Sequence, residues 1–160
     1  MILNLTQYQT KEIKKINSVK DVTALRTIRK NVLYERLPNF YAIYDEDFDK
    51  ETKHYIITYK KKIVTGASLI KKPYSLKNNL KSYQIRGMFT QKLFRKLGFG
   101  SHLIKYLLCL AKKDDNLDIL WCNSRRNAVD FYINNGFIKS TGFFLIKKIG
   151  IHNRLFLDCR

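Results

Sequence analysis

The chain of 160 residues has the size of one domain, and its 45% apolar and 13% aromatic content excludes an intrinsically disordered composition. Its 31 lysines and arginines against 13 acidic residues give a formal net charge of +18, which favours an anionic partner such as nucleic acid, a membrane surface or a phosphorylated cofactor. The charge does not choose among these, and part of it follows from a bias towards Lys, Asn, Ile, Tyr and Phe that is typical of an AT-rich genome. We expect one globular domain over residues 1–160.

The cysteines and histidines indicate neither a disulfide framework nor a metal site. Cys109, Cys122 and Cys159 are odd in number and widely spaced, which is typical of reduced thiols in an intracellular protein. The three histidines are isolated, so no bound metal is expected. The N-terminus lacks signal-peptide features, and no apolar run is long enough to span a bilayer. These features predict a cytoplasmic protein without a membrane partner.

The first half of the chain predicts a strand, a helix and a hairpin. A strand over residues 12–19 precedes a helix whose apolar residues start at Val22 and which ends near Pro38. Residues 44–51 contain five acidic side chains and are expected to form a mobile loop or a short helix. Alternating apolar residues then indicate a hairpin of strands 55–59 and 63–70.

The second half predicts further strands that alternate with two helices. Strands are expected at 82–90, 117–123, 143–149 and 152–158, and helices at 101–113 and 125–135. The whole order, without internal repeats, indicates an α/β (α+β) fold. Its centre is a mixed, mostly antiparallel sheet of about six to seven strands, flanked by helices.

Two glycines mark the boundary between the predicted strand 82–90 and the helix that follows. Gly98 and Gly100 lie in "FRKLGFGSHL", with Arg95 ahead of them. Glycine costs a helix about 1 kcal/mol relative to alanine, whereas a helix N-terminus with small residues offers free amides and a positive dipole to an anion. The spacing fits neither the Rossmann nor the P-loop pattern. An anion-binding loop and a simple tight turn are therefore both consistent with the pair.

The surrounding residues resemble a known family. The run "IRGMFTQKLFRKLGFGSHLI" is similar to the acyl-CoA-binding motif of the GNAT superfamily of N-acetyltransferases, Arg/Gln-x-x-Gly-x-Gly/Ala between a strand and a helix. The later run "LWCNSRRNAVDFYINNGF" resembles a second family segment at the expected distance. Its matching residues are Trp121, Cys122, Asn123, Arg125, Ala128, Phe131, Tyr132, Gly136 and Phe137. Together the two motifs cover residues 83–137.

The resemblance implies an acetyl-CoA-dependent enzyme and assigns its site residues. Backbone groups of Met88, Phe89 and Thr90 would bind the pantetheine arm, with help from Asn123. The pyrophosphate would be bound by the amides of Arg95, Lys96, Leu97, Gly98, Phe99, Gly100 and Ser101. Tyr132 would protonate the departing CoA thiolate, the alternative being a core aromatic residue. Lys96 and Leu97 depart from the usual residues of the loop, which affects the expected affinity for CoA more than the fold.

The implied reaction is direct attack of a primary amine on the thioester, which requires a base for the amine proton. Candidate bases near the acceptor are Glu35, Asp45, Glu46, Asp47, Asp49 and Glu51, whereas His152 in the last strand favours a structural role. We expect the acidic segment 44–51 to attract a cationic amine, the alternative being a solvated loop that offsets positive charge.

Two other functions remain open on the sequence. The net charge and the lysines at 60–62 and 71–72 favour an acceptor linked to RNA or to a ribosomal protein. A non-catalytic CoA-binding or interaction module is the second alternative. A homodimer that pairs through strands 143–149 and 152–158 is a further hypothesis.

Overall fold

The computed structural model describes residues 11–37, 42–75, 79–114 and 116–160. The strands are β1 (Glu12–Ile16), β2 (Lys53–Tyr59), β3 (Lys62–Lys71), β4 (Ser82–Thr90), β5 (Ile119–Arg125), β6 (Ile138–Ile146) and β7 (Gly150–Asp158). The helices are α1 (Val19–Leu33), α2 (Phe99–Asp114) and α3 (Val129–Ile133). Short 3₁₀ helices are η2 (Asp45–Phe48), η3 (Lys92–Phe94) and η4 (Arg126–Ala128).

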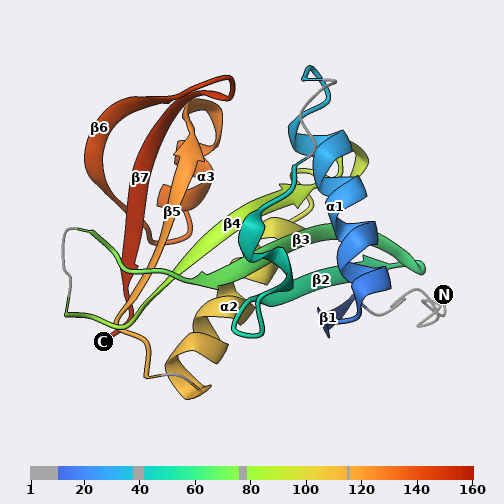
Figure 1. Cartoon of the computed structure of the whole chain (residues 1–160), viewed down its shortest axis with the longest axis horizontal. Helices are drawn as coiled ribbons and strands as arrows, with labels where there is room; N and C mark the ends of the chain where they lie inside the picture. The colour runs from blue at the N-terminus through green and yellow to red at the C-terminus, as the bar shows by residue number, and fades with distance from the viewer. Residues whose placement is uncertain (1–10, 38–41, 76–78, 115) are drawn as a thin grey trace, which may run out of the picture.

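The described strands form a seven-stranded sheet in the order β1-β2-β3-β4-β5-β7-β6. β4 and β5 are parallel, and the other neighbouring pairs are antiparallel. Helix α1 lies over one face of the sheet and α2 over the other, as Figure 1 shows. The mixed, mostly antiparallel sheet with flanking helices predicted from the sequence is thus confirmed.

Two apolar clusters hold the helices on the sheet. Under α2 and α3, Leu103 and Leu107 pack with Leu120 of β5 in the larger cluster, and all three are fully buried. Under α1, Leu25 packs with Phe89 of β4. Successive strand residues point to opposite faces, so each position on β4, β5 or β7 belongs to the α1 face or to the α2 face.

The first helix begins at Val19, the first residue of the helical segment in the sequence, and it ends earlier than predicted. The Ser18 side chain caps α1 by accepting a hydrogen bond from the backbone N–H of Asp21 at 3.1 Å, so β1 ends at Ile16. At the other end, the backbone N–H of Tyr34 donates to Lys30 O, and the helix ends at Leu33. Pro38, where the helix was expected to end, lies outside the described residues.

The predicted β2–β3 hairpin is confirmed. Two lysines of the cluster at 60–62 form its turn. Lys60 and Lys61 form its turn with φ values of 50° and 62°, the left-handed pair that a tight hairpin connection requires. Their side chains are exposed at the turn.

Element boundaries in the second half differ from the prediction, most at β5, α3 and β6. β5 lies two residues later in the chain than expected, and the expected helix 125–135 is divided into η4 and the shorter α3. β6 begins at Ile138 rather than at Phe143. The sequence did not indicate this start, because the polar and glycine residues 139–142 lack the alternation of a strand, and their pairing with β7 is irregular. β6 forms one edge of the sheet and exposes Phe143 and Leu145.

The three cysteines are free thiols, with Cys122 and Cys159 buried. Within the described part of the chain, no helix is both long enough and apolar enough to cross a membrane.

Candidate active site

The parallel strands β4 and β5 separate towards their carboxyl ends. Residues 82–85 pair with residues 119–122, and beyond this point the strands run apart (Figure 1). Among the described residues no strand pairs with the β5-facing edge of β4 after Ile85. Such an open edge can bind an extended ligand as an added strand. The predicted pantetheine residues Met88, Phe89 and Thr90 lie on this part of β4.

A bulge at Gly87 shapes the open part of β4. Gly87 and Met88 lie opposite a single residue of β3, and Gly87 has a φ of 59°. A Cβ atom there would lie 2.7 Å from the Nε of Arg29 and 2.9 Å from the Tyr44 ring, so only glycine fits. The bulge directs the Met88 and Phe89 side chains into the cores on opposite faces, leaving their backbone as the part that can contact a ligand.

The loop between β4 and α2 has the features of an anion site. Lys92, Arg95 and Lys96 are exposed on it, and the Nε of Arg95 donates to Thr90 O at 3.1 Å. The backbone N–H groups of Phe99, Gly100 and Ser101 at the start of α2 precede the first helical hydrogen bond, from His102 N–H to Gly98 O, and the helix start adds a positive dipole. Free amides and cations therefore meet where the open edge of β4 ends.

The two loop glycines serve different purposes. Gly98 has a φ of 80° and open space around its Cα, so its backbone conformation requires glycine. Gly100 has helical neighbours, and a Cβ there would lie 3.1 Å from the Phe131 ring and 3.4 Å from the Thr90 hydroxyl. Close packing of α3 on the first turn of α2 thus accounts for Gly100.

The other loop residues differ in what their side chains can offer. Phe99 is buried against Phe94, with ring centroids 6.0 Å apart, and leaves only its backbone accessible to a ligand. The Ser101 hydroxyl accepts a hydrogen bond from Asn135 Nδ2 at 3.1 Å, which ties α2 to the end of α3. Leu97 is 58% exposed.

Tyr132 lies at the point where β4 and β5 begin to separate. It is buried, packs on Phe137 at 5.3 Å between ring centroids, and interacts with Cys122, which pairs with Ile85 at the last paired position. Burial raises the pKa of the Tyr132 phenol well above its ordinary value, and Cys122 and Tyr44 act in the same direction. The phenol is therefore protonated at neutral pH and can act only as a proton donor.

Asn123 is the first residue of β5 beyond the paired region, on the α1 face. Its Oδ1 accepts a hydrogen bond from the Nε of Arg154 at 3.2 Å, so its side chain is oriented by β7.

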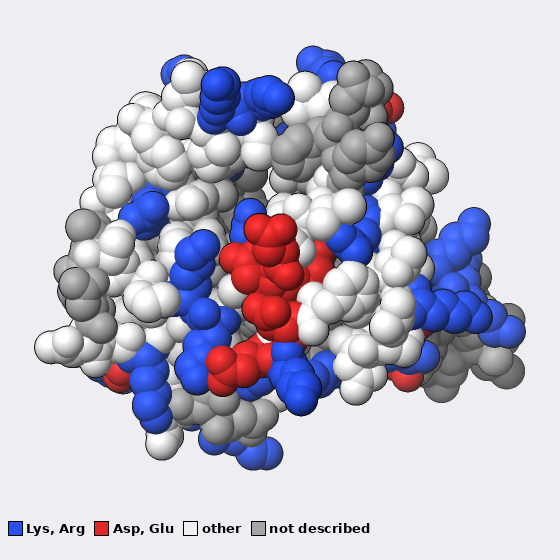
Figure 2. All heavy atoms as spheres, in the orientation of Figure 1, with Lys and Arg blue, Asp and Glu red and all other residues white. Residues whose placement is uncertain are grey.

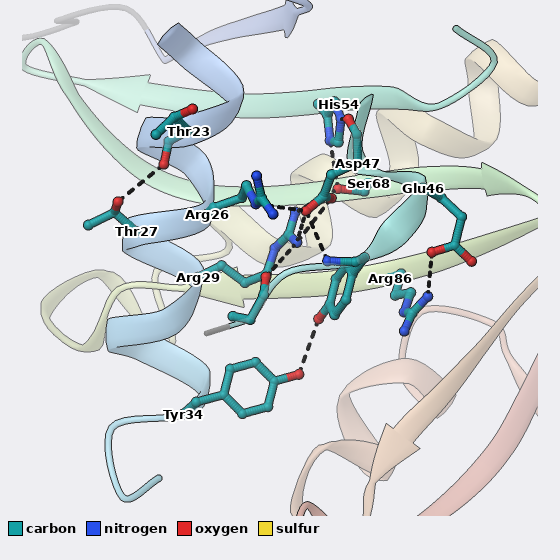
Figure 3. A network of polar contacts seen from close by, with 12 residues as sticks. Thr23, Arg26, Thr27, Arg29, Tyr34, Glu46, Asp47, His54, Ser68 and Arg86 are labelled. Atoms are coloured by element: carbon teal, nitrogen blue, oxygen red, sulfur yellow. Dashed lines mark hydrogen bonds and ion pairs between the residues drawn. The ribbon is translucent and has the colours of Figure 1, made fainter. Parts of the chain in front are cut away.

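The acidic segment 44–51 is anchored to the sheet. The Asp47 carboxylate is fully buried and contacts the Nη1 of Arg29 at 3.0 Å and the Nε of Arg26 at 3.2 Å (Figure 3). Arg29 also donates to the Ser68 hydroxyl, and the His54 ring bridges Ser68 and the carbonyl of Asp47. Of the two expectations for this segment, a mobile loop or a short helix, the structure has the short helix η2, docked on the sheet. Asp47 is a structural residue rather than an accessible base.

The remaining carboxylates of the segment lie at the surface. Glu46 bonds Arg86 at 2.9 Å and lies 3.7 Å from Lys72, while Glu51 bonds Lys71 at 2.8 Å. Burial alone would raise the pKa of Glu46, but its backbone hydrogen bond and the two cations lower it below the ordinary value. Figure 2 shows acidic side chains gathered at the middle of this face, between lysines and arginines.

Two surface hollows lie on this side of the molecule. One, of about 420 Å³, is lined by Glu46, Asp49, Lys50, Glu51, Thr52, Ile70, Lys71 and Lys72. The other, of about 390 Å³, is lined by Lys30, Asn31, Tyr34 and Glu35. Neither includes a predicted cofactor residue. Among the described residues, no group of three or more His, Cys, Asp or Glu side chains is arranged to hold a metal ion.

His152 is buried on β7, where its Nδ1 donates to Gly150 O at 2.8 Å and its ring packs on Phe144. Burial lowers its pKa, and the nearby Arg125 acts in the same direction, so the ring is neutral near pH 7. These contacts support the structural role expected for it.

Comparison with known proteins agrees with this geometry. Residues 7–149 match the family model of the acetyltransferase (GNAT) domain. The chain is 28% identical to the uncharacterized N-acetyltransferase YitI of Bacillus subtilis (strain 168) over 109 residues, which is 68% of this chain and 72% of YitI.

Two solved structures share the fold. Escherichia coli ElaA has a TM-score of 0.76 at 18% identity, over 93% of this chain and 100% of ElaA. An aminoglycoside 6'-N-acetyltransferase complexed with coenzyme A has a TM-score of 0.71 at 11% identity, over 93% of this chain and 97% of that protein. The fold, the open β4 edge and the family match together define an acyl-CoA-dependent transferase. The chain belongs to the GNAT superfamily of N-acetyltransferases (EC 2.3.1.-).

Proposed function

We propose that the protein transfers an acetyl group from acetyl-CoA to a primary amine by direct attack of the amine on the thioester. The observation that carries this proposal is the continuity of the open β4 edge with the cationic loop and the start of α2. An extended pantetheine arm fits the first, and a pyrophosphate fits the second. Residues 88–90, 95–101 and Asn123 are the proposed cofactor residues.

In this proposal the backbone of β4 orients the acetyl donor and stabilises the negative charge that develops on the thioester oxygen. Its unpaired N–H groups hold the thioester in reach of the amine and donate to the oxygen on which negative charge develops. The thioester supplies the activated acetyl group. The C–S bond breaks as the C–N bond forms, and the buried phenol of Tyr132, protonated at neutral pH, gives its proton to the leaving sulfur. The proton that the amine nitrogen loses goes to solvent water, from which the phenol is reprotonated.

A thermal-shift experiment tests the cofactor site. Acetyl-CoA or CoA at 100 times its Kd should stabilise the folded protein by about 2.7 kcal/mol. Leu97→Glu should abolish the shift, because a carboxylate on this exposed position repels the pyrophosphate. The same measurement with dephosphorylated CoA shows how much the terminal phosphate of CoA contributes to binding.

The control is Leu145→Glu, which changes the charge equally at an exposed leucine of β6 and should retain the shift. A folded wild-type protein that neither acetyl-CoA nor CoA stabilises would exclude both the proposal and a CoA-binding module, and would leave a non-catalytic interaction module.

A further inference from the structure

Three arginines lie on the α1 face around the opening between β4 and β5. Arg86 is the first residue of β4 beyond the paired region, Arg125 ends β5, and Arg154 of β7 lies opposite Asn123. Each is placed on this face by alternation with a residue that belongs to the α2-face core. These core residues are Ile85, Cys122 and Leu155.

Two tyrosines connect the arginines across the opening. The Arg125 guanidinium lies 5.0 Å from the Tyr34 ring centroid, and the Tyr34 hydroxyl is 3.1 Å from the Tyr44 hydroxyl. The Arg86 guanidinium in turn lies 4.0 Å from the Tyr44 ring centroid. Figure 3 shows Tyr34 and Arg86 on the two sides of this connection. Side chains from both separated strands thus converge on one place.

Carboxylates offset only part of this positive charge. Glu46 forms an ion pair with Arg86 at 2.9 Å, but among the described residues no carboxylate pairs with Arg125 or Arg154. Their contacts are to neutral groups. These are the Tyr34 ring for Arg125, and Asn123, Ser75 and the rings of Trp121 and Phe144 for Arg154. Two half-buried guanidinium groups therefore keep their charge available to a ligand.

Within the part of the chain that the structure describes, the α1 face of the opening is the side that no helix packs closed at Cys122, so we take it as the acceptor's approach to the open β4 edge. On the other face, α2 and α3 close the sheet, with Tyr132 and Cys122 buried where the strands separate. An amine that approaches from the α1 face passes the arginines before it meets the thioester proposed to lie along β4.

We infer that the acceptor is an amine that carries an anionic group, a carboxylate or a phosphate, a few bonds from its nitrogen. Arg125 and Arg154 bind that group, since guanidinium forms strong paired hydrogen bonds with both anions. This inference rests on the proposed acetyl transfer. It departs from the expectation of a cationic amine, since of the five carboxylates in the segment 44–51 Asp47 is buried and Glu46 and Glu51 are held in ion pairs, which leaves Asp45 and Asp49 exposed.

Matched pairs of amines test the inference. Alanine is compared with alaninamide, phosphoethanolamine with ethanolamine, and spermidine serves as a purely cationic probe. The wild type should prefer the anionic member of at least one pair, and the two pairs separate carboxylate from phosphate recognition. Arg125→Gln should lower kcat/KM for the preferred anionic amine about tenfold or more, mainly through KM, and change the neutral partner little.

The decisive quantity is the ratio of kcat/KM for the anionic amine to kcat/KM for its neutral partner. The change in this ratio from wild type to variant is compared, because the intrinsic reactivity of each amine cancels in it. Arg126→Gln is the matched control, since the neighbouring Arg126 is exposed and stacks on Phe143 instead. Arg154→Gln is the second variant in case Arg125→Gln fails to fold.

The possible results separate the two proposals. Equal or better acetylation of neutral amines or spermidine would overturn the anionic acceptor while leaving acetyl transfer intact. So would binding of acetyl-CoA, seen by thermal shift, without acetylation of either anionic amine. Failure to bind acetyl-CoA would overturn the proposed function itself.

Discussion

The hydroxyl of Tyr132 is buried beside the Cys122 thiol, at the place where the sheet opens. From sequence, this tyrosine fits both a proton donor and a core aromatic residue, and the structure shows that its ring fills the core while its hydroxyl lies near the open edge of β4. The roles are compatible, because the buried phenol, whose pKa is raised by desolvation, still carries its proton at neutral pH while its ring packs in the core.

Tyr132→Phe should therefore lower kcat by about 10²-fold or more, the range expected for the loss of a general acid, with little change in acetyl-CoA binding. Ring packing is retained, so the unfolding temperature should change little. Steady-state kinetics with a thiol-release assay measures kcat. An unchanged kcat would leave Tyr132 as a core residue only.

The sequence did not show why residue 87 must be a glycine. The "RGM" run suggested only a family resemblance, whereas the requirement for glycine comes from Arg29 and Tyr44, which lie far away in the chain and within 3 Å of its missing Cβ. Gly98, by contrast, needs glycine for its own backbone conformation, which is why the local motif was sufficient to indicate it.

At the scale of elements, the docking of η2 on the sheet depends on one buried carboxylate. Asp47 joins η2 to α1 through Arg29 and Arg26, and its carbonyl joins η2 to β2 through His54. The sequence shows five acidic residues in a row of eight and does not show which of them points inward.

Asp47→Asn should destabilise the protein by about 3–5 kcal/mol, because Arg29 would be left fully buried without its counter-charge. Asp45→Asn removes the same charge two residues away at an exposed position and should alter stability by no more than about 0.5 kcal/mol. Urea unfolding measures both values. Equal effects of the two substitutions would show that the network contributes no specific anchoring.

At the scale of the whole molecule, a net charge of +18 coexists with two buried neutral histidines. His54 uses both ring nitrogens, one towards the Ser68 hydroxyl at 2.8 Å and one towards the Asp47 carbonyl at 2.7 Å. Because a carbonyl oxygen can only accept, Nε2 donates to it, and in a neutral ring Nδ1 then accepts from the Ser68 hydroxyl, which itself accepts from Arg29. Burial lowers the pKa of His54 and of His152 below the ordinary value of 6.5.

The free energy of unfolding should therefore fall as the pH drops below about 6.5, where these histidines bind protons in the unfolded chain but remain neutral in the folded protein. Above this pH the contribution of both groups is fully present, and it is lost progressively towards their lower folded pKa values. Protonation also adds to an already large positive charge, which acts in the same direction. Thermal unfolding from about pH 7.5 to about pH 5.5 measures the slope, and the double variant His54→Gln, His152→Gln should flatten it. A slope unchanged in that variant would assign the acid sensitivity to other groups.

The sequence by itself determined the order of strands and helices, the glycine loop and the family, because these depend on local periodicity, on turn chemistry and on short motifs that act on neighbouring residues. Only the tertiary structure decided which charges remain available. It buries Asp47 against Arg29, separates β4 from β5, and brings Arg86 and Arg125 together through two tyrosines. Such contacts join residues far apart in the chain, and their energies depend on burial and on distance, which exist only once the elements have packed.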